Sequence, residues 1–307
     1  MHVVVVGAGA VGGYFGALLA RAGERVTFLA RGAHLHAIRA NGLAVRSPLG
    51  DFVVHCEAVE DPARAGEADV VLFTVKTYDN PVAARLLPPL LGERGVVLTL
   101  QNGVDSTEEL AAVVGARRVL AGAAYVATAL VEPGIIEQTG THRRIVFGEV
   151  FGDPPRLSDR VLAIREALER AGVDVEAVAD ARGPLWEKFV YLAPFSGFTA
   201  AARLPIGPLW QDDLIRSQLM AAFDEVASVA AAEGIELPDG AIDRIRAYTA
   251  ALPPATRSSL LVDLAQGRRL EVESLQGSVV RRAARAGVAV PIMTTLYALL
   301  KPYAEGA

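Results

Sequence analysis

Cysteine is almost absent from this 307-residue sequence, which contains only Cys56. One thiol cannot form an intramolecular disulfide or supply a thiolate cluster for zinc or an iron–sulfur centre. Long hydrophobic runs are also missing, because the longest, residues 119–131, contains Gly122 and Thr128 and is too short to cross a bilayer. The sequence therefore excludes a disulfide scaffold and a cysteine metal centre, and we expect no membrane span.

We expect no targeting segment, since Met1 and His2 lead directly into a run of valines. Because a basic segment and a cleavable apolar region are lacking, the expected location is the cytosol. The formal net charge of −5 provides no sequence-wide attraction to nucleic acid. His34 and His36 stand two residues apart, would not share a helical face and have no partner in a metal motif. We predict that both are surface residues and that the protein has no metal site.

The length favours two domains, and a composition of 52% hydrophobic and 21% charged residues excludes a disordered chain. In the first part of the chain, runs rich in β-branched residues alternate with helical segments, which predicts an α/β fold with a doubly wound parallel sheet. The strands predicted for this sheet are residues 3–6, 26–29, 70–75 and 96–100. Further elements expected in this domain are strands at 119–131, 134–138, 144–147 and 173–178, with turns at 132–134 and Gly140, and a helix at 157–171.

From residue 181 onward the strand patterns end and long helical periodicities replace them. The helices predicted there include residues 214–233, 242–251 and 271–286. We therefore predict a sheet-containing domain over residues 1–180 and an all-helical domain over residues 181–307.

A glycine-rich turn follows the first predicted strand, with Gly7, Gly9 and Gly12 at the spacing G-x-G-x-x-G. This spacing is typical of turns that bind the pyrophosphate of a dinucleotide. Gly7 would make the tight turn, Gly9 would leave room for phosphate, and Gly12 would let the helix pack closely on the strand. The predicted cofactor contacts in this turn are Gly7, Ala8, Gly9, Ala10, Val11 and Gly12. A glycine-rich turn that serves only packing is the alternative.

The end of the second predicted strand indicates which nicotinamide cofactor would bind. NAD-selective folds place an acidic residue there, but this strand ends in Leu29-Ala30-Arg31. A guanidinium can hold a 2′-phosphate through its fork of donors, which favours NADPH. A solvated surface arginine is the competing interpretation, because arginines are common in this part of the sequence.

Three polar side chains are candidates for ligand binding or catalysis. Lys76 and Asn102 directly follow two predicted strands, at the sheet edge where open α/β folds bind ligands. A solvent-exposed loop lysine and an asparagine that caps a turn are the alternatives. Lys188 stands among apolar and aromatic residues on a predicted helix, where desolvation would lower its pKa and allow it to protonate a developing alkoxide. A lysine that buries only its stem is the alternative here.

The whole chain resembles the ketopantoate reductase family, the NADPH-dependent 2-dehydropantoate 2-reductases. The motifs that carry the resemblance are G-A-G-A-V-G-G at 7–13, V-K-T at 75–77, Q-N-G-V at 101–104, L-W-E-K at 185–188, S-S-L-L-V-D-L at 258–264, L-E-V-E-S-L-Q-G at 270–277 and G-V-A-V-P at 287–291. The resemblance implies a Rossmann-type NADP-binding domain over residues 1–180 and an all-helical catalytic domain over residues 181–307, with the active site in the cleft between them.

The resemblance also implies residue roles. Lys188 matches the general acid for the ketone oxygen, and Glu271 matches a carboxylate associated with cofactor, substrate and lysine. Ser259 matches a contact to the substrate carboxylate, and Asn102 matches a residue near nicotinamide and substrate. The positions that match further cofactor contacts are Arg31, Lys76 and Thr128. For Glu271 the alternative is a residue in the first turn of a helix, stabilised by the positive helix end.

Two predicted substrate contacts depart from the family pattern. Asparagines usually stand four and eight residues after the lysine, but this chain has Leu192 and Ser196. Because leucine cannot hydrogen-bond, a pocket around Leu192 should prefer an apolar group of the substrate. Pro194, between these positions, removes a backbone amide and is expected to kink the helix.

These observations predict NADPH-dependent reduction of a 2-oxo acid to a 2-hydroxy acid. Ketopantoate is the first candidate substrate, and the resemblance places that reaction in pantothenate biosynthesis. Two alternatives remain open: a reductase of the same family that acts on a less polar carbonyl compound, and a non-catalytic sensor that binds NADPH. Apart from a small-molecule substrate, the partner considered is a second copy of the chain in a homodimer.

Overall fold

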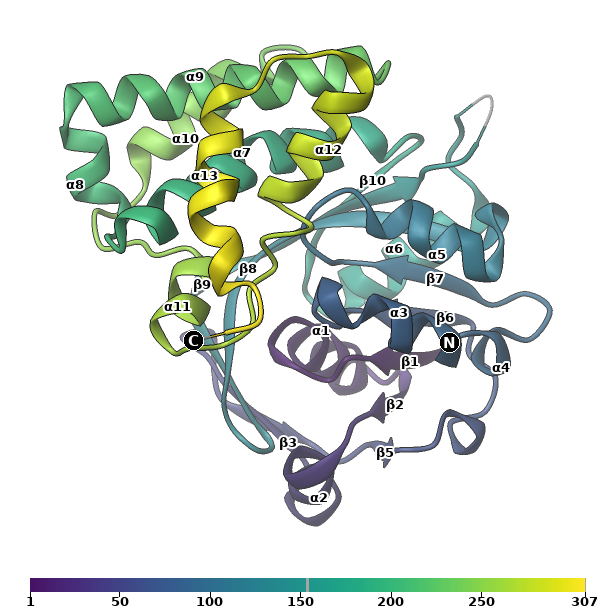
Figure 1. The fold of residues 1–307 in the computed structure, drawn as a ribbon. Helices are drawn as coiled ribbons and strands as arrows, with labels where there is room; N and C mark the ends of the chain where they lie inside the picture. The colour runs from purple at the N-terminus through teal and green to yellow at the C-terminus, as the bar shows by residue number, and fades with distance from the viewer. Residues whose placement is uncertain (153–154, 307) are drawn as a thin grey trace. The chain divides into compact units, whose positions relative to one another are not determined.

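A computed structural model describes residues 1–152 and 155–306 of the chain. The chain divides into two compact units, each of which combines segments separated in the sequence (Figure 1). The first unit consists of Met1–Gln101 and Ser106–Ala181. The second consists of Asn102–Asp105 and Arg182–Ala307, so that four residues from the N-terminal part of the sequence group with the C-terminal helices.

The first unit is built on a mixed sheet with strand order β4-β3-β9-β8-β7-β6-β1-β2-β5, and β10 pairs with β9 outside this path. Its centre is β1 (His2–Val6), which pairs in parallel with β2 (Arg25–Leu29) and with β6 (Val70–Phe73). In turn, β6 pairs in parallel with β7 (Val96–Thr99). Because strands of a parallel sheet are buried on both faces, they appear in the sequence as unbroken apolar runs, and these four strands were predicted. The strand order reverses between β1 and β6, where open α/β sheets bind ligands.

A long antiparallel hairpin extends the sheet, formed by β8 (Val119–Glu132) and β9 (Ile135–Glu149). The predicted turn at residues 132–134 is confirmed, but the prediction of two short strands in place of β9 is wrong. Gly140, expected to make a turn, instead lies within β9 with φ +76°. A glycine tolerates this conformation inside a strand, so its presence did not require the strand to end.

Three short strands were not predicted: β3 (Leu43–Arg46), β4 (Phe52–Val54) and β5 (Glu57–Val59). They are too short to show a distinct periodicity, and they lie toward the two edges of the sheet. The remaining strand of the unit, β10 (Asp174–Val178), runs parallel to β9 and follows the predicted helix α6 (Asp159–Arg170).

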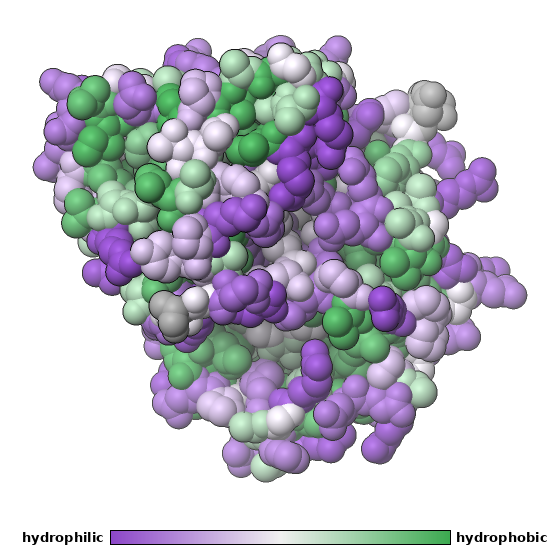
Figure 2. Space-filling model, in the orientation of Figure 1, coloured by the Kyte–Doolittle hydropathy of each residue, from purple (hydrophilic) through white to green (hydrophobic). Residues whose placement is uncertain are grey.

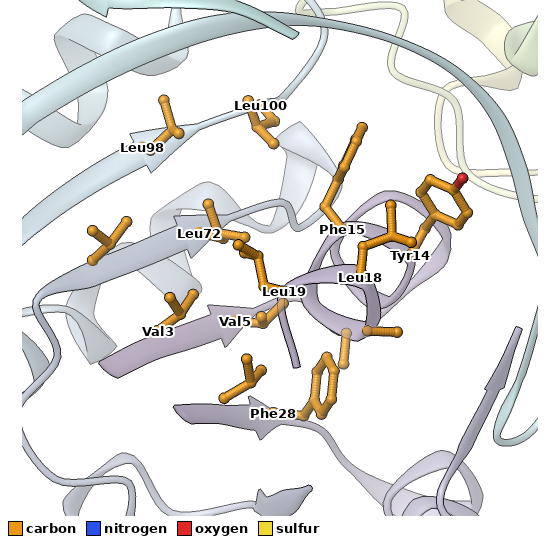
Figure 3. Close-up of a cluster of buried hydrophobic side chains, with 14 of the residues drawn as sticks. Val3, Val5, Tyr14, Phe15, Leu18, Leu19, Phe28, Leu72, Leu98 and Leu100 are labelled. Atoms are coloured by element: carbon orange, nitrogen blue, oxygen red, sulfur yellow. The ribbon is translucent and has the colours of Figure 1, made fainter. Parts of the chain in front are cut away.

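Helix α1 (Ala10–Arg21) forms much of the core of the first unit (Figure 3). Its apolar side chains, including Phe15 and Leu19, pack with residues of the parallel strands such as Phe28. Gly16 allows close approach here, since a Cβ at this position would lie 2.6 Å from the Phe28 ring. The other helices of this unit are α2 (Gly32–Asn41), α3 (Asn80–Ala83), α4 (Pro88–Leu91) and α5 (Ser106–Val114), with 3₁₀ turns η1 (Pro62–Arg64), η2 (Thr77–Asp79), η3 (Ala84–Leu86) and η4 (Ala116–Arg118).

The regular elements among the described residues of the second unit are all helices. Its longest helix, α7 (Arg182–Ala202), contacts most of the other helices of the unit and continues as a helix through Pro194. The other helices are α8 (Ile206–Gln211), α9 (Asp213–Ala232), α10 (Ala241–Ala251), α11 (Ser259–Ala265), α12 (Gln276–Ala286) and α13 (Pro291–Leu300), followed by η5 (Lys301–Tyr303). Because α12 begins at Gln276 rather than at 271, Glu271 precedes the helix, and the alternative that placed it in the first helical turn is wrong.

Within residues 1–152 and 155–306, no helix is both long enough and apolar enough to cross a membrane. On the face drawn in Figure 2, hydrophilic and hydrophobic side chains are interspersed. Single exposed apolar residues, such as Val82 and Leu214, are normal on protein surfaces.

Candidate active site

The three motif glycines of the first unit occupy different environments. Gly7 has φ +99°, and a Cβ there would lie 2.5 Å from the backbone nitrogen of Val75. A Cβ at Gly12 would lie 2.4 Å from the carbonyl oxygen of Gly7, whereas a Cβ at Gly9 would meet no atom within 4 Å. The turn is therefore tight at Gly7, closely packed at Gly12 and open at Gly9. This geometry fits a pyrophosphate at the N-terminus of α1, where the helix lacks a side-chain cap.

Two side chains hold the glycine turn in place. Thr74 Oγ1 donates a hydrogen bond to the carbonyl oxygen of Gly7 at 2.8 Å. His34 bridges two backbone groups: its Nδ1 accepts from the Gly134 N–H at 2.9 Å, and its Nε2 lies 2.7 Å from the carbonyl oxygen of Ala8. Because Nδ1 accepts, Nε2 carries the hydrogen and donates to Ala8. His36 is exposed as predicted, whereas His34 is half-buried, and its bridging role was not predicted.

The other predicted cofactor contacts of the first unit follow or lie within its strands. Arg31 is exposed and directly precedes α2, and Lys76 is half-buried and directly precedes η2. Thr128 lies in β8 at a register shift, and its Oγ1 is buried without a hydrogen-bond partner among the described residues. A buried hydroxyl oxygen without a partner is uncommon in proteins.

Gln101 has a structural role that the sequence reasoning missed. Its Nε2 donates to the carbonyl oxygen of Val75 and to Asn80 Oδ1, both at 2.7 Å, and its Oε1 accepts from Thr99 Oγ1 at 3.0 Å. These bonds join the carboxyl ends of β6 and β7, the edge at which Lys76 stands. A polar residue at the end of an apolar strand is the only sequence signal for this role.

In the second unit, a lysine and an amide from distant parts of the sequence meet. Lys188 Nζ on α7 donates to Asn102 Oδ1 at 3.0 Å. The flanking side chains of Leu185, Trp186 and Phe189 are buried. Burial lowers the pKa of Lys188 to about 8, and the negative charge of Glu271 opposes this shift. Lys188 is therefore a stronger acid than an ordinary lysine and remains largely protonated at neutral pH.

Glu271 is buried in the turn that precedes α12. Its carbonyl oxygen accepts hydrogen bonds from Ser274 Oγ and from the backbone N–H of Leu275, both at 3.1 Å. The segment that carries Asn102 lies close to this turn, because a Cβ at Gly103 (φ +89°) would lie 2.8 Å from the carbonyl oxygen of Ser274. An ammonium, an amide and a carboxylate are thus gathered in one unit, and together they can donate a proton to a ligand oxygen.

The two predicted substrate contacts that follow Lys188 on α7 differ in how exposed they are. Leu192 is half-buried, whereas Ser196 is fully buried and donates to the carbonyl oxygen of Ala193 at 3.2 Å. An amide does lie beside Ser196, but it comes from α12: Gln276 Nε2 donates to Ser196 Oγ at 3.0 Å and to Ala193 O at 2.7 Å. Gln276 Oε1 is buried without a partner among the described residues. The separation of Gln276 from α7 in sequence hid this contribution.

Ser259, the predicted contact to the substrate carboxylate, is exposed at the start of α11. The preceding residue, Ser258, is buried and caps this helix through a hydrogen bond from the Leu261 N–H to its Oγ at 3.0 Å. Ser258 Oγ also lies 2.7 Å from Thr199 Oγ1 on α7. Of the two serines, Ser259 is therefore the one whose side chain reaches the surface.

Comparison with known proteins matches nearly the whole chain to one family. The family model "Ketopantoate reductase PanE/ApbA" matches residues 3–152, and "Ketopantoate reductase PanE/ApbA C terminal" matches residues 180–304. A 2-dehydropantoate 2-reductase of Halobacterium salinarum is 34% identical over 98% of each chain. The crystal structure of 2-dehydropantoate 2-reductase from Geobacter metallireducens is 35% identical, with a TM-score of 0.91 over 98% of this chain and 99% of that one.

A more distant structure shares the fold alone. D-mandelate dehydrogenase, solved with NADH and anilino(oxo)acetate, superposes with a TM-score of 0.89 over 99% of this chain and 98% of that one, at 20% identity. The family matches confirm the resemblance carried by the sequence motifs. The chain belongs to the ketopantoate reductase family of oxidoreductases.

Proposed function

We propose that this protein reduces a 2-oxo acid to a 2-hydroxy acid with NADPH. The first candidate for this substrate is 2-dehydropantoate. The observation that carries the proposal is the hydrogen bond from Lys188 to Asn102, formed by a lysine whose burial lowers its pKa to about 8. The relatives named 2-dehydropantoate 2-reductase in Halobacterium salinarum and Geobacter metallireducens support this choice of substrate.

The first unit would hold the cofactor. Open space at Gly9 suits the pyrophosphate, and the exposed Arg31 at the end of β2 suits a 2′-phosphate. Lys76 and the unpaired hydroxyl of Thr128 would make further cofactor contacts. The reduced nicotinamide, when bound, supplies the hydride. Because Arg31 stands where NAD-selective folds place an acidic residue, we propose NADPH rather than NADH.

The second unit would supply the proton. Addition of a hydride to the carbonyl carbon turns the ketone oxygen into an alkoxide, and Lys188 would stabilise this negative charge and then protonate the oxygen. The neutral amine that results would take up a proton from solvent, which completes the cycle. Asn102 would orient the ammonium group through the 3.0 Å hydrogen bond, and the charge of Glu271 favours its protonated form. Ser259 would contact the substrate carboxylate.

A second candidate substrate follows from Leu192. This half-buried leucine lies one helical turn beyond Lys188, where it would face an apolar group of the substrate rather than a polar one. A 2-oxo acid with a branched apolar side chain is therefore the alternative to 2-dehydropantoate.

A panel of 2-oxo acids tested with NADPH and NADH separates these proposals. We expect the highest kcat/KM for 2-dehydropantoate with NADPH. Negligible turnover of 2-dehydropantoate beside fast turnover of a branched apolar 2-oxo acid would establish the alternative substrate. Tight NADPH binding without turnover of any carbonyl compound would instead indicate the sensor that the sequence left open.

A further inference from the structure

Arg282 on α12 is buried between two carboxylates of the second unit and is only 5% exposed. Its Nε and Nη2 donate to Asp105 Oδ1 at 2.9 and 2.7 Å, and its Nη1 donates to Glu233 Oε2 at 2.5 Å. A buried guanidinium needs such partners, because an uncompensated charge would be strongly destabilising. The planar fork of donors also fixes the direction from which Asp105 is held.

This guanidinium contacts side chains that are close in sequence to each group of the Lys188–Asn102 hydrogen bond. Asp105 lies three residues after Asn102, at the other end of the four-residue segment 102–105. On the other side, the Arg282 guanidinium lies 5.7 Å from the ring centroid of Trp186, which stands two residues before Lys188 on α7. One side chain thus connects the segment that carries the amide with the helix that carries the lysine.

The segment 102–105 is anchored at further points. Ser278 Oγ, one turn before Arg282 on α12, donates to Asp105 Oδ1 at 2.7 Å. At Gly103, the backbone packs so closely against Ser274 that a Cβ would come within 2.8 Å of the Ser274 carbonyl oxygen. These contacts leave the segment little freedom to move relative to α12, so the position of Asn102 depends on them.

We infer that Asp105 and Arg282 are positioning residues, which hold the segment 102–105 so that Asn102 Oδ1 meets Lys188 Nζ. This inference rests on the proposed reductase function. A lysine ammonium is a compact charge on a flexible stem with rotatable donors, so its direction is set by what accepts from it. If Asp105 is released, Asn102 shifts and Lys188 is no longer aimed at the ketone oxygen. Cofactor binding by the first unit should be unaffected.

A double-mutant cycle tests the inference on the full-length enzyme, with 2-dehydropantoate and NADPH. Asp105→Ala should lower kcat by about 10- to 100-fold, since misplacement of a catalytic group by about 1 Å has this effect. The Kd for NADPH should stay unchanged. In the Asn102→Ala background, the same exchange should change kcat by less than about twofold, because its effect passes through Asn102. Equal effects of Asp105→Ala in both backgrounds would overturn the inference and show that the ion pair of Asp105 with Arg282 is only structural.

Two further variants keep the test decisive. If Asp105→Ala does not fold, Ser278→Ala removes a single hydrogen bond to Asp105 and should lower kcat by about 3- to 10-fold, with the same dependence on Asn102. The matched control is Asp224→Ala, which breaks the exposed pair of Asp224 with Arg246 at 3.1 Å in the same unit and should leave kcat unchanged. A wild-type enzyme inactive on every 2-oxo acid would refute the proposed function and this inference together. An active wild type with independent effects would refute the inference alone.

Discussion

The glycine turn of the first unit and the lysine cluster of the second are assembled in different ways. Gly7, Gly9 and Gly12 lie within one short stretch of sequence, and their environments follow from a strand, a turn and a helix in succession. Lys188 and Asn102, in contrast, are hydrogen-bonded across a separation of 86 residues. The turn uses backbone amides and the absence of side chains, whereas the cluster uses a buried charge and its partners.

Because of this difference, we expect substitutions in the two regions to change different properties of the enzyme. Changes in the glycine turn alter the space and the backbone groups available to a cofactor, so they should act on cofactor affinity. Changes in the lysine cluster alter a proton donor, so they should act on the chemical step. Variants in the two regions can therefore be distinguished by a split between Kd for the cofactor and kcat.

The largest effect is expected for Lys188→Ala. Loss of the proton donor should lower kcat by roughly 10²- to 10⁴-fold, the usual contribution of general acid catalysis, while the Kd for NADPH stays unchanged. Steady-state kinetics and a fluorescence titration with NADPH measure the two quantities. Lys301→Ala, at an exposed lysine of the same unit, is the control and should retain full activity. Comparable kcat for Lys188→Ala and wild type would remove Lys188 from the mechanism.

Arg31→Ala should affect the first unit alone. Loss of charge-assisted hydrogen bonds to a 2′-phosphate should raise the Kd for NADPH by about 10- to 100-fold. The Kd for NADH, which lacks that phosphate, should change little, and kcat at saturating NADPH should be retained. Arg25→Ala, at the opposite end of β2, serves as the control. An equal loss of affinity for both cofactors would show that Arg31 does not select NADPH.

Gly9→Ala and Gly12→Ala should separate cofactor space from packing within the turn. A Cβ at Gly12 would overlap Thr74 Oγ1 and the Gly7 carbonyl, so this variant should lose about 1–3 kcal/mol of unfolding free energy. A Cβ at Gly9 meets no protein atom, so this variant should keep the wild-type Tm while its Kd for NADPH rises. Thermal unfolding and NADPH titration provide the measurements. A stable Gly12→Ala variant, or tight NADPH binding by Gly9→Ala, would contradict the described geometry.

The smallest effect concerns pH. Lys188 must be protonated to act as the acid, so kcat should fall as the pH rises through its pKa of about 8. The negative charge of Glu271 raises this pKa, so the falling limb should move to lower pH in Glu271→Gln. Profiles of kcat against pH at saturating substrate and cofactor measure both. A kcat that stays constant up to about pH 10, near the pKa of an ordinary lysine, would contradict the depressed pKa.

Local patterns predicted the elements that are long or buried on both faces. The strands β1, β2, β6 and β7 are continuous apolar runs, and α6, α9 and α10 have clear helical periodicity. The short edge strands β3, β4 and β5 lack enough residues for a pattern, and β9 was divided because Gly140 resembles a turn signal. The start of α12 was placed too early because residues 271–275 continue its apolar periodicity without being helical.

In the candidate site, too, local sequence patterns identified some residues and missed others. Lys188 could be identified from its apolar neighbours and the L-W-E-K motif, and its partner Asn102 from its place after a strand. Three other residues gave no such signal. His34 bridges backbone groups 26 and 100 residues away, and Arg282 binds Asp105 across 177 residues. Gln276 reaches Ser196 across 80 residues.

The sequence by itself determined the alternation of strands and helices, the glycine turn and the presence of a lysine in an apolar helix. These features depend on hydrophobic periodicity and backbone conformation, which act over a few neighbouring residues. Only the tertiary structure decided which polar groups meet: Asn102 with Lys188, Asp105 with Arg282, and His34 with the glycine turn. Hydrogen bonds and desolvation depend on distances in space, and those distances are set by packing of the whole chain rather than by any one segment.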